Sequence, residues 1–188
     1  LGAVIGMEGS RADRRELFDI ALAGPLAGLA VAVPVLAAGL AIGSPTTANP
    51  FSLPLLGRWL EAVVRPDLAA GQTIAPNPLL LAGWVGLLVT GLNMIPISQL
   101  DGGHVCHALC GRRSHLVTRG VLLAAITGII VFGGYHWVAM VVIITLMGVD
   151  HPPIRNEHVP LDSWRRALGV ASCLIPIATF MPEPLKLR

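Results

Sequence analysis

The stretch NMIPISQLDGGH, residues Asn93–His104, closes an apolar run that begins at Leu79. No charged residue lies between Leu79 and Gln99, and a helix of that length can cross the roughly 30 Å hydrocarbon core of a bilayer. The run then ends on the carboxylate of Asp101. A carboxylate at or near membrane depth costs about 2.5–3.5 kcal/mol on insertion scales, so its presence indicates a functional site.

Pro96 predicts a break in this helix. Its ring nitrogen cannot donate a backbone hydrogen bond, and its ring frees the carbonyl of Leu92, four residues earlier. In lipid, such irregular backbone is tolerated only where protein or a water-filled cavity receives it. Asn93 offers a side-chain amide one turn before the break. Asn93, Pro96 and Asp101 are therefore candidate site residues.

The composition is that of an integral membrane protein. Of the 188 residues, 13% are charged, against about 25% in a typical soluble domain, and the mean hydropathy is +0.71. The 15 prolines and 21 glycines fit membrane helices, which carry more of both. A net charge of +2 is too small to indicate nucleic-acid binding. We expect one domain over residues 1–188, in contact with the lipid bilayer.

We expect an all-α fold, a polytopic transmembrane helical bundle with four to five membrane segments and a short N-terminal β-like stretch at residues 1–6. The spans are expected at about 17–43, 79–100, 116–133, 136–149 and 167–181. The apolar run 120–149 is long for one tilted span and short for two. The distribution of basic residues slightly favours a hairpin that turns at Gly133-Gly134, and it places the more basic side in the cytoplasm.

Two further segments have open interpretations. Gly24 and Gly28 are four residues apart in the first span, a spacing that lets a neighbouring helix approach closely. They serve packing alone, or they close on a helix that carries part of a site. The Pro-rich segment 44–78 has an amphipathic middle at residues 55–64, which we expect to be interfacial or to form a short lid.

The polar residues after Asp101 form a second cluster. Cys106 and Cys110 lie about one turn apart, and with His104 and His107 they could bind zinc. A structural zinc site usually draws its ligands from two separated pairs, so a juxtamembrane helix with scattered polar residues is the favoured interpretation. Together with Cys173 these cysteines make an odd number and give no disulfide framework.

Taken together, these residues resemble the site-2 proteases, which are intramembrane zinc metalloproteases. The resemblance rests on four motifs in the family's order, over nearly the whole chain: LFDI running into AGPLAG (residues 17–28), AGWVG (82–86), Asn93-x-x-Pro96 followed by LDGGH (100–104), and HPP to PLD (151–162). No inserted PDZ domain fits between Gly43 and Leu79, as in the bacterial and plastid-type branch.

The resemblance implies a zinc cofactor, Zn²⁺, with Asp101 as its third protein ligand. It implies that Asn93 and Pro96 line the active-site cleft, where Asn93 would orient a substrate strand or assist the oxyanion. Five residues would pack around the site: Gly24, Pro25, Gly28, Gly102 and Gly103. The family's two histidine ligands and catalytic glutamate lie in a His-Glu-x-x-His motif, which these 188 residues do not contain.

We therefore expect the C-terminal part of a zinc metalloendopeptidase, truncated before Leu1 and inactive without that motif. Its partner would be a transmembrane protein substrate, cleaved in regulated intramembrane proteolysis, and its location the bacterial cytoplasmic (inner) membrane. The alternative is a non-catalytic membrane scaffold or substrate-binding relative. A small transporter would need more polar residues within its spans.

Overall fold

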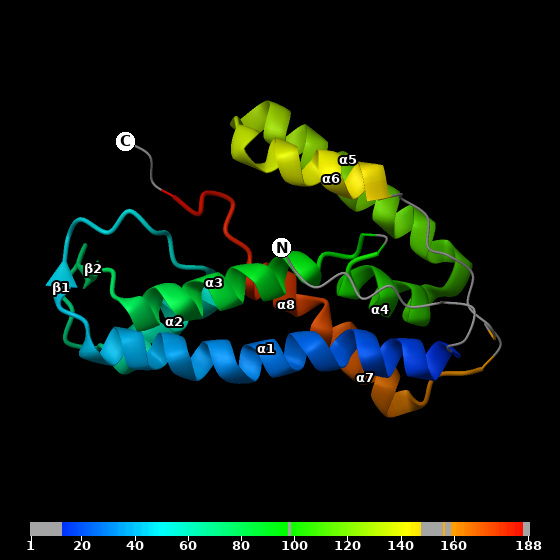
Figure 1. Cartoon of the computed structure of the whole chain (residues 1–188), viewed down its shortest axis with the longest axis horizontal. Coiled ribbons are helices and arrows are strands. Elements are labelled where there is room, and N and C mark those ends of the chain that lie inside the picture. The colour runs from blue at the N-terminus through cyan, green and yellow to red at the C-terminus, as the bar shows by residue number, and fades with distance from the viewer. Residues whose placement is uncertain (1–12, 98, 148–155, 157–158, 186–188) are drawn as a thin grey trace. The chain divides into compact units, whose positions relative to one another are not determined.

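The structure, a computed structural model, describes residues 13–97, 99–147, 156 and 159–185 (Figure 1). These residues are mostly helical, which confirms the predicted helical class. The number of membrane segments stays a prediction, as does a single domain over the whole chain. The expected β-like stretch at residues 1–6 and the HPP motif at 151–153 lie outside the described residues.

The chain divides into two compact units, each described here by itself. The first unit comprises Leu1–Pro25 and Asn93–Leu174, and the second comprises Leu26–Leu92 and Ile175–Arg188. Helix α1 (Arg14–Ile42) contributes to both units. Two helical stretches in the described part of the chain are long and apolar enough to cross a membrane: Arg14–Ile42, and Asp101–Phe132 taken as one.

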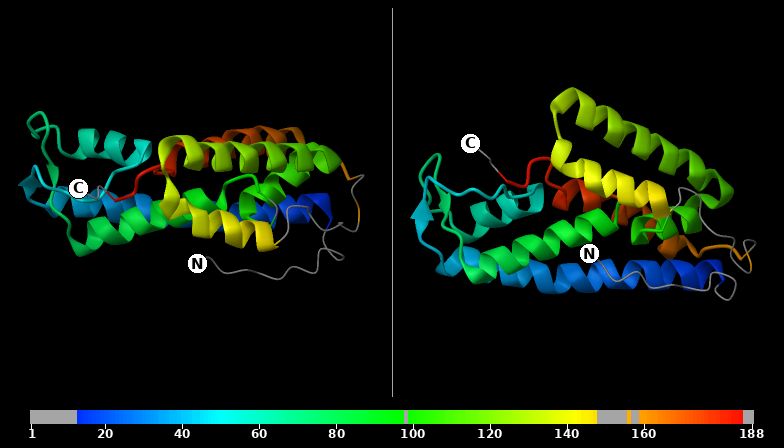
Figure 2. Two further views of the ribbon diagram at one scale, coloured as in Figure 1. Left: turned by 90° about the horizontal axis from the view of Figure 1, so that it is seen from above. Right: turned by 45° about the horizontal axis from the view of Figure 1, so that its top comes forward.

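The second unit is built on α1 and α3 (Pro78–Asn93), which lie side by side in the views of Figures 1 and 2. Between them the chain forms β1 (Pro45–Thr46), α2 (Leu55–Val64) and β2 (Thr73–Ile74), and the two strands pair antiparallel. The short helix α8 (Leu174–Thr179) follows near the end of the chain.

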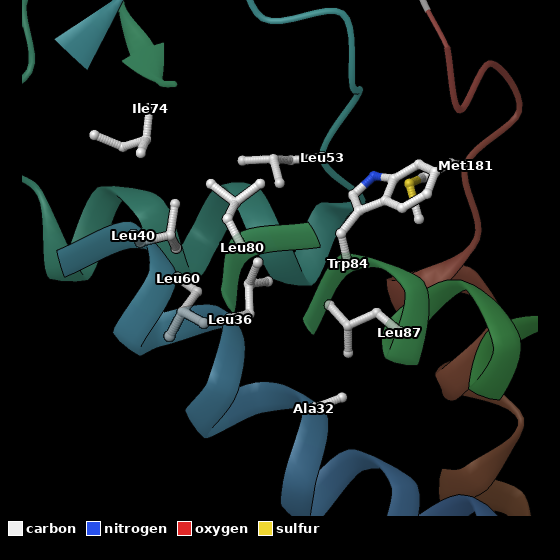
Figure 3. Close-up of a cluster of buried hydrophobic side chains, with 10 residues drawn as sticks. All are labelled: Ala32, Leu36, Leu40, Leu53, Leu60, Ile74, Leu80, Trp84, Leu87 and Met181. Carbon is white, nitrogen blue, oxygen red and sulfur yellow. The ribbon is translucent and has the colours of Figure 1, made fainter. Parts of the chain in front are cut away.

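Leucines and glycines together bring α1 and α3 close. Leu36, Leu40, Leu80 and Leu87 are fully buried in a cluster that also contains Trp84 and Met181, together with four other apolar residues (Figure 3): Ala32, Leu53, Leu60 and Ile74. A Cβ added at Gly83 would lie 2.5 Å from the backbone nitrogen of Leu36, so only glycine permits this approach. In lipid the hydrophobic effect does not drive helices together, and small residues instead allow the close van der Waals packing that holds them.

The first unit contains α4 (Asp101–Cys110), the 3₁₀ turn η1 (Gly111–Arg113), α5 (Ser114–Phe132), the 3₁₀ turn η2 (Tyr135–Trp137), α6 (Val138–Met147) and α7 (Ser163–Ser172). Helix α5 ends where Gly133 adopts a left-handed conformation, with φ of 73°. Its N–H donates to the carbonyl of Ile129, which closes the helix. Helices α5 and α6 contact each other, so the predicted turn at Gly133 is present.

Two expected spans are interrupted. The span expected at 79–100 ends as a helix at Asn93, three residues before Pro96, because proline cannot continue the hydrogen-bond ladder. The span expected at 167–181 is divided into α7 and α8, with Cys173 between them. Pro176, which has no N–H to donate, lies within the second of these short helices.

Candidate functional site

Asp101 is the first residue of α4 and is partly buried. The preceding residue, Leu100, has an extended backbone and no side-chain cap, so the helix begins abruptly at the carboxylate. A negative charge in the first helical turn is stabilised by the helix dipole. The carboxylate is therefore held at a defined place by the backbone that precedes it.

Gly102 determines how the broken helix meets α4. A Cβ at this position would lie 2.7 Å from the carbonyl oxygen of Ile95 and closer still to that of Met94. No side chain fits there without a shift of backbone, so glycine is required for the break to fold back on the start of α4. Gly103 is also buried. Both glycines, which were predicted to pack around the site, directly follow Asp101 in the chain.

Gly24 faces the Asp101 carboxylate from α1. Its nearest neighbour, measured from the position of an added Cβ, is Oδ2 of Asp101 at 3.9 Å, and both residues belong to the first unit. Pro25, next in the chain, is buried. Helix α1 thus presents its smallest side chain to the carboxylate, which leaves space for another group beside it.

The break itself is held by hydrogen bonds. The carbonyl oxygen of Pro96 accepts a hydrogen bond from the buried Thr118 hydroxyl of α5 at 3.3 Å, and the N–H of Ile97 donates to the carbonyl of Ile95 at 2.7 Å. Asn93 ends α3 and is partly exposed. Sequence analysis missed Thr118, a hydroxyl within an apolar helix. A polar side chain on such a helix is the signal that could have identified it.

The predicted site residues do not all meet. Asp101, Gly102 and Gly24 come together in the first unit, and the chain of the break passes against Gly102. Gly28 lies in the second unit, where an added Cβ would be 2.9 Å from the Thr90 hydroxyl of α3. Helix α3 carries Asn93 at its end. The contacts of Gly28 are therefore those of helix packing.

Arg14 anchors the far end of α4. Its guanidinium donates to the carbonyls of Ala108 and Leu109, at 2.6 and 3.1 Å, in the last turn of that helix. A cation there satisfies carbonyls that have no partner within the helix and complements the dipole. Because Arg14 belongs to α1, it ties the start of that helix to the helix that begins with Asp101.

A second set of contacts fixes α7 in the first unit. Arg165 donates to both carboxylate oxygens of Asp19, at 2.9 and 2.7 Å, and to Asp162. The hydrogen bonds to Asp19 hold the pKa of the Arg165 guanidinium above its usual range. Gly169 packs against Leu109 and Phe18. A Cβ added at Gly169 would lie 2.9 Å from a side-chain carbon of each of them. Helices α1 and α7 are thus joined to each other and to α4, the helix that carries Asp101.

The cysteine and histidine cluster does not form a metal site. His107 is buried and its Nδ1 lies 3.1 Å from the Ser114 hydroxyl, while Cys106, Cys110 and Cys173 are free cysteines. Across the described residues, no three His, Cys, Asp or Glu side chains are grouped as metal ligands. By themselves, the described residues therefore do not bring together a set of metal ligands.

Comparison with known proteins adds the family. The model of peptidase family M50 matches residues 1–133. Among curated proteins, the chain is 31% identical to "Probable zinc metalloprotease EGY1, chloroplastic" of Arabidopsis thaliana, over 96% of this chain and 35% of that protein. It is 28% identical to "Probable zinc metalloprotease EGY2, chloroplastic" of the same plant, over 97% and 34%. The chain spans about a third of the length of these relatives.

Another relative has a different kind of name. The chain is 35% identical to "DDT domain-containing protein PTM" of Arabidopsis thaliana, over 71% of this chain and 8% of that protein. No solved structure matches the chain. The expected location in a bacterial inner membrane is wrong, because the zinc metalloprotease relatives are chloroplastic plant proteins.

The family match covers the first span, the helix break, Asp101 and the helix that ends at Gly133. Three of the four motifs on which the resemblance to site-2 proteases rested lie within the matched residues, and the match confirms that resemblance. The chain belongs to peptidase family M50, the site-2 protease family.

Proposed function

We propose that this chain is part of a site-2-type zinc metalloprotease that hydrolyses peptide bonds of transmembrane protein substrates in a chloroplast membrane. The observation that carries the proposal is the placement of Asp101. Its carboxylate begins α4, beside a helix break, and faces a glycine of α1 that leaves room for another group. The family match and the names of the chloroplastic relatives support the same function.

In this proposal Asp101 is the third protein ligand of zinc. A carboxylate oxygen suits zinc at about 2.0–2.2 Å, beside two imidazoles and a water. The imidazoles and the general base belong to a His-Glu-x-x-His motif that is not among these 188 residues, so the chain by itself is not expected to cleave. When bound, zinc supplies a water whose pKa falls to about 7.

Asn93 and Pro96 line the cleft in the same proposal. Helix α3 ends at Asn93, and the next helix, α4, begins at Asp101. In this proposal the side-chain amide of Asn93 offers a hydrogen-bond donor to an extended substrate strand beside the break. Thr118 holds the carbonyl of Pro96 so that this edge keeps its shape.

The decisive experiment replaces Asp101→Ala in the full-length protein that carries the His-Glu-x-x-His motif. Cleavage of a transmembrane substrate is measured together with zinc content per molecule. We expect both to fall, since one of three protein ligands is removed. Asp67→Ala is the matched control, because that carboxylate is exposed and pairs with Arg65, away from α4 in the sequence. Undiminished cleavage by the Asp101 variant would exclude the assignment.

The second candidate is a non-catalytic membrane scaffold or substrate-binding relative. The similarity to the DDT domain-containing protein favours it, because that name states no protease activity although the match covers 71% of this chain. The discriminating observation is the coding sequence upstream of Leu1. A His-Glu-x-x-His motif there in an apolar segment supports the protease, and its absence from the complete gene supports the scaffold.

A further inference from the structure

The segment between α1 and α3 was expected to be interfacial or to form a short lid, and the contacts of α2 bear on how deep it lies. Arg65, the residue that caps α2, donates through Nη1 to the carbonyls of Gly43 and Leu40, at 2.8 and 3.3 Å. These are the last carbonyls of α1, which a cation stabilises through the helix dipole. The C-terminal end of α2 is therefore level with the C-terminal end of α1.

From that level, α2 extends back along α1 instead of away from it. Leu60 of α2 is buried in the same cluster as Leu36 and Leu40 of α1, and Figures 2 and 3 show α2 beside α1 and α3. Ten helical residues at about 1.5 Å each span about 15 Å. Leu55, the first residue of α2, is thus about 15 Å from the end of α1 toward its middle.

A second set of contacts gives the same depth independently. The indole N–H of Trp84 donates to the carbonyl of Ser52 at 2.7 Å, and the rings of Phe51 and Trp84 meet edge to face at 5.2 Å. Trp84 lies six residues inside α3, about 9 Å from its start. The start of α3 is tied to the last turns of α1, because the Asn77 amide donates to the carbonyl of Gly39 at 2.9 Å.

Part of the extended backbone just before α2 is paired with protein groups. The Asn49 side chain is 6% exposed, donates to the carbonyl of Ile74 at 2.7 Å and accepts from the N–H of Phe51 at 2.8 Å. The N–H of Ser52 donates to the carbonyl of Pro184 at 3.0 Å. Non-helical backbone is tolerated at membrane depth only when it is paired in this way.

The outward face of α2 is apolar. Leu55, Trp59 and Val63 follow one another at intervals of four residues and are 59, 62 and 58% exposed, while Gly57 and Leu60 are buried on the opposite face. Helix α1 has 29 residues and is about 43 Å long, whereas the hydrocarbon core is about 30 Å thick. A helix of this length centred in the core projects about 6–7 Å beyond it at each end. Trp59, about 9 Å from that end, then lies near the boundary where tryptophan is favoured.

We propose that residues 45–77 form a re-entrant segment that enters the bilayer beside α1 and returns to the same side, with lipid covering its apolar face: acyl chains around Leu55, the core boundary at Trp59 and headgroups at Val63. The proposal rests on the membrane setting of the proposed function. Arg58 is exposed on α2 and reaches the interface by extending its side chain along the helix, as long cationic side chains do. Arg65 and Asp67 pair among the headgroups, at 2.9 Å.

The test measures depth residue by residue. Single cysteines are introduced as Leu55→Cys, Trp59→Cys, Val63→Cys, Gln72→Cys and Val31→Cys, in the full chain with its three native cysteines replaced by alanine. Each variant is spin-labelled in phosphatidylcholine vesicles, and collision with dissolved oxygen is compared with collision with a water-soluble nickel chelate. Gln72 is an exposed residue of the turn before β2, and Val31 is an exposed residue inside α1.

We expect protection from nickel to rise stepwise from residue 72 through 63 and 59 to 55, with residue 31 fully protected. Equal, shallow depth at 55, 59 and 63 would show a helix lying flat on the surface, and nickel access at 55 equal to that at 72 would show a loop in water. Either result overturns the re-entrant segment while residue 31 stays protected. Nickel access at residue 31 would instead overturn the membrane setting itself. Circular dichroism of each variant identifies any that does not fold.

Discussion

Glycine has different structural roles in the two units. In the second unit, Gly83 removes the side chain that would separate α1 from α3, and leucines around it are buried completely. In the first unit, Gly102 lets an irregular backbone approach the start of α4, and Gly24 leaves room beside a carboxylate. The comparison teaches that the same small residue makes a tight apolar contact in one region and an accessible polar position in the other.

The largest effect is expected from Gly83→Ala in the tight helix contact. The added Cβ would lie 2.5 Å from the Leu36 nitrogen and 2.6 Å from its Cα and Cβ, so α1 and α3 must separate along their length. Overpacking of this kind costs about 3 kcal/mol, at the upper end of its range. Unfolding in a detergent titration followed by circular dichroism measures the loss.

Gly128→Ala is the matched control for that variant. Gly128 lies inside α5 and an added Cβ would meet nothing within 4 Å. Alanine is favoured over glycine in a helix by about 1 kcal/mol, so this variant should be more stable than the parent chain. A destabilised Gly128 variant, or an unaffected Gly83 variant, would contradict the account of the glycine contacts.

A smaller loss of stability but a specific loss of function is expected for Gly102→Ala. The Cβ would overlap the carbonyls of Met94 and Ile95 and push the break away from the start of α4. We expect a cost of about 2 kcal/mol. Because Asp101 is the neighbouring residue, substrate cleavage by the full-length protein should fall more than the folded fraction does. Equal loss of both would assign Gly102 to folding alone.

Arg14→Ala tests the anchor at the other end of α4. The carbonyls of Ala108 and Leu109 lose their charged donor, and stability should fall by about 1–2 kcal/mol. Arg14→Lys should restore part of this, since an ammonium supplies the charge without the planar fork. Thermal unfolding of both variants gives the difference. If Lys behaves as Ala does, the charge contributes nothing.

The smallest effect is expected at Gly24. With Asp101 Oδ2 at 3.9 Å from an added Cβ, Gly24→Ala introduces ordinary contact only, and as at Gly128 the helix propensity of alanine should stabilise the variant by at most about 1 kcal/mol. Gly24→Leu would fill the space beside the carboxylate, so cleavage by the full-length protein should fall although the fold remains. Normal cleavage by the leucine variant would show that this space is not used.

Part of the site could be predicted because its signals are local. Pro96 predicts the end of the preceding helix whatever surrounds it, since a missing N–H is a covalent property. Gly133 similarly predicts a helix end, and the structure places it in the left-handed conformation. Asp101 follows a long apolar run, where a carboxylate near membrane depth costs free energy whatever the tertiary fold. The family match covers this residue.

The remainder depends on contacts between distant segments. Arg14 meets the end of α4 across 94 residues, and Thr118 meets Pro96 across 22, so neither pairing has a local pattern. The amphipathic pattern of α2 predicted a helix with one apolar face, but a surface helix and a helix beside α1 share that pattern. Only the Arg65 and Trp84 hydrogen bonds distinguish them.

The sequence by itself determined the apolar helices, the break at Pro96, the turn at Gly133 and the residues that identify the family. These follow from hydropathy, from the proline ring and from the freedom of glycine, which act within a few residues. The tertiary structure decided that Gly24 faces Asp101, that Gly28 packs on Thr90 and that α2 turns back along α1. Those outcomes depend on which backbones approach closely, a property that the chain acquires only when its helices pack.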